Sequence, residues 1–158
     1  METSFISLVA KMSDDTFQEV IQSSPRKIRE TLFGRLGIKA KKSVGLKVHG
    51  KLEDRSKKLH EKLRSATTPQ EAQLCEELVR NWLYTKRQLL IDTLDHLGVK
   101  HEGGLVDEEP TFFQELSEEK VNSLVKSLRE KGHGDEVIQA YLFFVKTPHL
   151  DTIFKAAA

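Results

Sequence analysis

Apolar residues recur along this chain at the spacing of α-helices. Val121, Leu124, Val125 and Leu128 follow one another at intervals of three and four, which places them on one face of a helix. Similar spacing runs through most of the sequence, and no stretch shows a convincing strand or hairpin pattern. The pattern therefore predicts an all-α fold, a bundle of about six or seven helices.

Capping residues indicate where helices begin. Ser13 precedes Asp14 and Asp15, and a serine N-cap followed by acidic residues in the first turn stabilises a helix N-terminus. Ser117 follows Leu116 in the same way and should cap the helix that carries the Val121 stripe. These signals are local and depend on no tertiary contact.

The clearest start signal opens what should be the longest helix. Thr68 to Glu71 combines a capping box with Pro69 at the first helical position. No glycine or proline follows until Gly98. The sequence therefore predicts one long central helix, about 69–97 and roughly 43 Å in length, against which the others pack.

Charge is distributed unevenly, although the net charge of the whole chain is only +1. Residues 23–65 hold 14 Lys and Arg against 4 Asp and Glu, whereas residues 66–158 hold 10 against 16. We therefore expect a basic helical N-terminal layer, 1–66, and an acidic helical bundle, 67–155. The alternative is one continuous domain, 1–155. A basic segment of this kind either binds an anionic partner or neutralises acidic surface on its own chain.

The basic segment is the first candidate for a binding site. Helical spacing allows Arg26 and Arg29 to share a face, and the irregular stretch 38–50 adds further lysines. The residues expected to contact an anionic partner are Arg26, Lys27, Arg29, Arg35, Lys39, Lys41, Lys42 and Lys47. That partner is either an acidic protein surface or nucleic acid.

Part of the basic segment resembles a helix-turn-helix motif. Leu32, Leu36, Gly37 and Ile38 match the apolar–glycine–apolar pattern around the turn. The resemblance implies that the lysines after the turn face duplex DNA. It departs from the motif at Phe33, where a small residue is expected. Phe33 is also the only Phe, Tyr or Trp between residues 23 and 65, which counts against single-stranded nucleic acid, since such binders stack bases on aromatic side chains.

A second candidate interface is the aromatic group Tyr141, Phe143 and Phe144. Four consecutive apolar residues, 142–145, cannot all face one core from a single helix. Either this helix is buried on most sides or part of it is an interface. Complementary charges in the two halves of the chain also suit self-association, so a homodimer is one expectation.

Candidates for catalysis are few. Cys75 lies inside a predicted helix as a packed core residue, and no glycine-rich phosphate loop is present. Asp92 and His96 are four apart on one helix face, and His101 follows, so these three are weak candidates for a metal site. A small metal-dependent helical enzyme is therefore a second alternative to the binding functions.

The sequence as a whole predicts a non-enzymatic helical binding module that docks its basic segment on an anionic partner. We expect no cofactor and no metal. The single cysteine favours a reducing, cytoplasmic setting, and no apolar run approaches the length that spans a membrane. A duplex-DNA-binding protein with a degenerate helix-turn-helix remains the main alternative.

Overall fold

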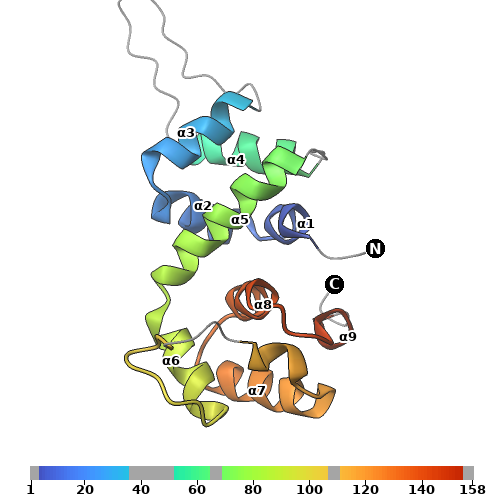
Figure 1. The fold of residues 1–158 in the computed structure, drawn as a ribbon. Helices are drawn as coiled ribbons and strands as arrows, with labels where there is room; N and C mark the ends of the chain where they lie inside the picture. Colours follow the sequence, from blue (N-terminus) through green and yellow to red (C-terminus); the bar gives the residue numbers. More distant parts are fainter. Residues whose placement is uncertain (1–3, 36–51, 65–68, 107–110, 155–158) are drawn as a thin grey trace, which may run out of the picture. The chain divides into compact units, whose positions relative to one another are not determined.

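The computed structural model describes residues 4–35, 52–64, 69–106 and 111–154, most of which are helical (Figure 1). These ranges contain nine α-helices, one 3₁₀-helix and one isolated β-bridge, between Glu102 and Leu105. The all-α prediction is confirmed, with more and shorter helices than expected. None of the helices in these ranges combines the length and the apolarity that a membrane crossing requires.

The chain forms two compact units, Met1–Trp82 and Leu83–Ala158. The boundary expected at 66/67 lies outside the described residues. The helices of the first unit are α1 (Phe5–Ala10), α2 (Asp14–Ser23), α3 (Arg26–Arg35), α4 (Leu52–Leu63) and α5 (Pro69–Tyr84), the last two residues of which belong to the second unit.

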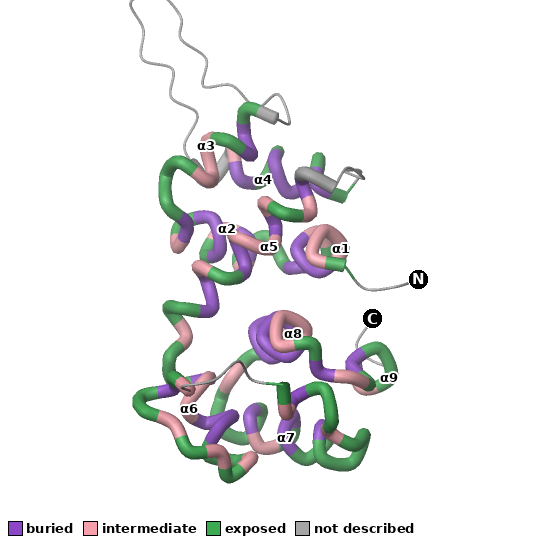
Figure 2. The backbone as a smooth tube through the Cα atoms, in the orientation of Figure 1, coloured by how far each residue is buried: buried purple, intermediate pink, exposed green. Residues whose placement is uncertain are grey.

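The core of the first unit is built around α4, which packs against both α1 and α2. Leu59 and Leu63 of α4 are fully buried, as are Phe17 of α2 and Cys75 of α5. Figure 2 shows buried stretches along the helices of this unit. Ser13 caps α2 as predicted, since its side chain accepts a hydrogen bond from the backbone N–H of Thr16, the third residue of the helix. The leucine stripe of α4 therefore faces the middle of this unit.

The long central helix expected at about 69–97 is instead two helices, α5 and α6 (Arg87–His96). Thr85 and Lys86 separate them, and the N–H of Lys86 donates to the carbonyl of Leu83 at 2.9 Å, a tight turn that ends α5. At this point the chain passes from the first unit to the second: Trp82 is buried in the core of the first unit and Leu89 in the core of the second.

The second unit packs α6 on α7, α7 on α8, and α8 on α9. The four apolar residues of the predicted α7 stripe, Val121 to Leu128, are all buried. Ser117 caps α7, with its side chain accepting from the N–H of Lys120. The elements that follow α6 are the 3₁₀-helix Phe112–Glu115, α7 (Glu118–Glu130), α8 (Asp135–Phe144) and α9 (Leu150–Phe154).

Three helices of the second unit end in the same way, with a left-handed residue just past the helix. Gly98 after α6 has φ 70° and Gly132 after α7 has φ 91°, conformations that glycine adopts without steric cost. After α8 the residue in this place is Lys146, with φ 62°. The next N–H, of Thr147, returns to the carbonyl of Leu142 at 2.9 Å, so the Schellman hydrogen bond forms without a glycine.

Candidate functional site

The predicted anion-binding residues are only partly described. Arg26 and Lys27 are exposed on α3, and Arg29 is half-buried. The side chain of Arg35 lies outside the described residues, as do Lys39, Lys41, Lys42 and Lys47. The predicted helix-turn-helix over 32–46 falls mostly outside them as well, because α3 is described only to residue 35.

Arg55 of α4 links helices α3 and α4. Both terminal nitrogens of Arg55 donate to the carboxylate of Glu30, at 3.4 Å and 3.2 Å. The Arg55 guanidinium also lies over the ring of Phe33, with 4.3 Å between its carbon and the ring centroid. An arginine can make both contacts at once because its guanidinium is planar and presents a fork of donors. The positive charge of Arg55 is therefore neutralised within the chain.

Four other cations on the two helices are exposed. Lys57 and Lys58 are exposed on α4, and Arg26 and Lys27 are exposed on α3. Among the residues whose side chains the structure describes, which leave out Glu53 and Asp54 of α4, none places an acidic group at ion-pair distance from these four side chains. We call these four residues the α3–α4 cations. The sequence analysis did not select the two lysines. They directly precede Leu59, and neighbouring residues of a helix point in different directions, so an inward-facing Leu59 leaves the lysines facing outward.

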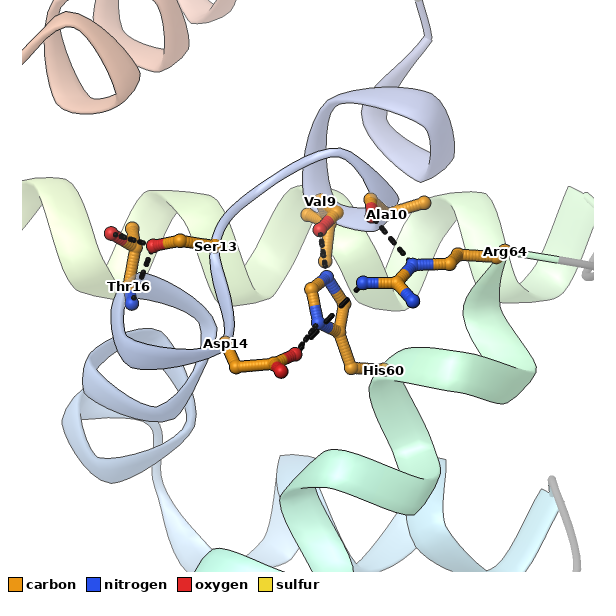
Figure 3. A network of polar contacts seen from close by, with 7 residues as sticks. All are labelled: Val9, Ala10, Ser13, Asp14, Thr16, His60 and Arg64. Carbon is orange, nitrogen blue, oxygen red and sulfur yellow. Dashed lines mark hydrogen bonds and ion pairs between the residues drawn. The ribbon is translucent and has the colours of Figure 1, made fainter.

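A connected polar group of the first unit surrounds His60 (Figure 3). The ring is fully buried in the unit and stacks on the ring of Phe17, with 4.4 Å between the centroids and 6° between the planes. Its Nδ1 lies 2.8 Å from a carboxylate oxygen of Asp14, and its Nε2 lies 2.9 Å from the carbonyl oxygen of Val9. One side chain of α4 thus contacts both α1 and α2.

Arg64, one turn after His60, adds a second link to the same junction. Its Nε donates to the carbonyl of Ala10 at 3.3 Å, and its Nη2 lies 3.9 Å from the carboxylate of Asp14 (Figure 3). The hydrogen bond from His60 lowers the pKa of Asp14, and the charges of His60, Arg64 and Lys57 add to this effect. The junction between α1 and α2 is therefore held by an ionised carboxylate.

The three candidate metal ligands, Asp92, His96 and His101, contact different partners. The Nε2 of His96 lies 3.3 Å from the hydroxyl of Ser123, and the Nε2 of His101 lies 2.6 Å from a carboxylate oxygen of Asp95. In the part of the chain that the structure describes, no three His, Cys, Asp or Glu side chains are grouped so that they could hold a metal ion. Each of the three candidates instead contacts residues other than the remaining two.

Asp92 belongs to a structural link in the second unit. Its carboxylate accepts hydrogen bonds from Gln88 at 2.9 Å and from His133 at 2.7 Å, and Lys131 lies 3.6 Å away. Burial opposes ionisation of Asp92, but the hydrogen bonds and the nearby positive charge outweigh it, so the pKa is lowered. The contacts fix the segment between α7 and α8 to α6.

The aromatic group that the sequence suggested as an interface divides into two parts. Tyr141 is buried, and its ring packs edge-on against Phe113, with 6.0 Å between the centroids. Burial raises the pKa of its hydroxyl. Phe143 and Phe144 are half-buried. Tyr141 thus lies in the core of the second unit, and the two phenylalanines lie at its edge.

Cys75 has the environment of a core residue. It is fully buried, and burial, assisted by the charge of Glu71, raises the pKa of its thiol to about 12. A reactive cysteine needs a large thiolate fraction and access to solvent, and Cys75 has neither. The thiol is therefore a small apolar group in the packing of α5.

Comparison of the chain with protein-family models, with curated proteins and with solved structures gives no match.

Proposed function

We propose that this protein is a non-enzymatic binding module that docks its basic segment on an acidic surface of a partner protein. The observation that carries this proposal is the exposure of the α3–α4 cations, which form no ion pair with the acidic side chains that the structure describes. Arg55 and Arg64, by contrast, are paired with Glu30 and Asp14. Exposed cations of this kind attract an anionic partner and speed its encounter with the protein.

Duplex DNA is the second candidate partner, because the segment 32–46 resembles a helix-turn-helix. We favour an acidic protein surface because binding to it requires no recognition helix. Phe33 is buried beneath Arg55, so the only aromatic side chain of the basic segment does not offer a stacking surface to unpaired bases. The test must therefore distinguish binding to duplex DNA from binding to an acidic protein surface.

A second copy of the chain is one partner of the required chemistry. Residues 66–158 carry 16 acidic against 10 basic side chains, so one copy could offer acidic surface to the basic segment of another. A homodimer formed in this way would have a mass near twice 18.0 kDa in light scattering and would dissociate as salt is raised. The single buried thiol of Cys75 suits a reducing, cytoplasmic location for such a protein.

The proposal is tested by titrating the labelled full-length protein with a glutamate-rich peptide and with duplex DNA, each at low and high salt. The test variant reverses the α3–α4 cations with Arg26→Glu, Lys27→Glu, Lys57→Glu and Lys58→Glu. The control reverses the same amount of charge at exposed residues of the second unit, with Arg87→Glu, Lys100→Glu, Lys120→Glu and Lys126→Glu. Circular dichroism checks that both variants are folded.

We expect the test variant to bind the glutamate-rich peptide at least about tenfold more weakly, and the control to change by less than about threefold. Equal losses in the two variants, or none in either, would contradict the proposal. Tighter binding of duplex DNA than of the peptide, with a log–log salt slope near −0.9 per phosphate contact, would transfer the function to nucleic acid.

A further inference from the structure

We propose that the first unit contains a pH-sensitive clasp, in which His60 must carry a proton on both ring nitrogens to hold α1 against α2 and α4. The clasp consists of the His60 ring, the carboxylate of Asp14 and the carbonyl of Val9 (Figure 3). When rising pH removes one of the two protons, one of the two hydrogen bonds is lost and α1 is held less tightly.

The requirement for two protons follows from the two partners. A backbone carbonyl has no proton, so Nε2 must donate to Val9. An ionised carboxylate has none either, so Nδ1 must donate to Asp14. A neutral imidazole has only one N–H, and it would turn a lone pair toward one of the two oxygens. The lowered pKa of Asp14 keeps the carboxyl ionised near neutral pH, so the second proton belongs to the ring.

The charged groups around the ring come from two elements. Asp14 of α2 faces Nδ1. Lys57, on α4, and Arg64, just after α4, act on the same carboxylate. Helix α1 offers backbone carbonyls, from Val9 and Ala10. The ring itself is fully buried, so no water can replace a lost partner, whereas Asp14 is 57% exposed and gives the proton a route to solvent.

A second histidine with the opposite arrangement provides an internal comparison. The Nδ1 of His101 accepts a hydrogen bond from the N–H of Gly104 at 3.0 Å, so it carries no proton, and its Nε2–H donates to Asp95. Between one donor and one acceptor, the neutral ring is fully satisfied. His60 and His101 should therefore differ in proton number at the same pH.

Helix α1 is the element that depends on the clasp. It has only six residues, Phe5–Ala10, and a helix this short is not stable without tertiary contacts. Its N-terminus is closed by the reciprocal capping box of Ser4 and Ser7, but its C-terminal carbonyls are bound by His60 and Arg64. Protection of the α1 amides against hydrogen exchange therefore reports whether the clasp is closed.

The test is ¹⁵N NMR of the histidine rings in the full-length protein, combined with amide hydrogen exchange across a pH series. At a pH where the α1 amides are protected, we expect both ring nitrogens of His60 to have the similar shifts of an imidazolium. His101 should show the widely separated shifts of a neutral ring. As the second proton of His60 is lost, exchange at Leu8 and Lys11 should accelerate by at least about tenfold beyond the intrinsic pH effect.

Asp14→Asn is the decisive variant, because the position is exposed and the chain should still fold. Its side-chain amide can donate to an unprotonated Nδ1, so a neutral ring becomes sufficient. We expect a singly protonated His60 ring to suffice for α1 protection in this variant, and the pH dependence of that protection to disappear. His60→Gln should likewise remove the pH dependence.

Two results would overturn the clasp. One is a pair of widely separated ¹⁵N shifts for His60 in the unsubstituted protein at a pH where α1 is protected. The other is α1 protection that stays constant while the ring loses its second proton.

Discussion

The guanidinium of Arg55 covers the ring of Phe33, so a charged side chain of α4 lies on an aromatic side chain of α3. Its terminal nitrogens hold the carboxylate of Glu30 at the same time, and the Arg55 side chain is only 16% exposed. The two helices that carry the α3–α4 cations are therefore linked by a contact that depends on the shape of arginine as well as on its charge.

Replacing this arginine by lysine keeps the charge and removes the planar fork. Arg55→Lys should lower the free energy of unfolding by about 1–2 kcal/mol, because the stacking on Phe33 and one of the two hydrogen bonds to Glu30 are lost. Urea denaturation measures the change. Lys58→Ala, at an exposed position of the same helix, is the control and should change it by less than about 0.5 kcal/mol. An Arg55→Lys protein as stable as its parent would contradict this role.

The left-handed lysine after α8 predicts a stabilising substitution. Lys146→Gly should raise the free energy of unfolding by about 0.5–1 kcal/mol, because glycine adopts a positive φ without the steric cost that a side chain has there. Thermal and urea denaturation would both detect the gain. Lys11→Gly is the matched control: Lys11 caps α1 with φ −85°, so glycine there relieves no strain and should bring no gain. A loss of stability in Lys146→Gly would contradict the prediction.

The lowered pKa of Asp92 predicts how stability depends on acid. A carboxyl whose pKa is lower in the folded state stabilises the fold fully above about pH 3.9, the ordinary aspartate value, and this contribution is lost as the pH falls through the folded value. Asp92→Asn should therefore flatten the fall in stability below about pH 4. Asp14→Asn should act in the same direction, since the pKa of Asp14 is also lowered.

Urea unfolding at a series of acidic pH values measures this dependence. Parallel curves for the parent protein and for both asparagine variants would show that neither carboxylate contributes to acid unfolding.

Features set by neighbouring residues could be predicted from the sequence. The starts of α2 and α7 follow from Ser13 and Ser117, whose hydroxyls cap the first turns. The ends of α6 and α7 follow from Gly98 and Gly132, which adopt the left-handed conformation. In each of these cases the residue that carries the signal lies within one or two helical turns of the helix end that it determines.

Features that depend on tertiary packing could not be predicted in this way. The break at Thr85 and Lys86 has no glycine or proline to mark it, and it occurs because the chain passes from one core to another. The link from Arg55 to Glu30 joins residues 25 positions apart, and nothing in the sequence distinguishes Arg55 from the other cations near it. Without the fold, this paired arginine looks the same as the exposed lysines.

The clasp around His60 has a consequence for a chain that is still being synthesised. His60 lies 46 residues after Asp14 and 51 after Val9. On the ribosome, α1 and α2 therefore leave the exit tunnel well before the residue that binds them, and the first unit can close only after α4 has emerged.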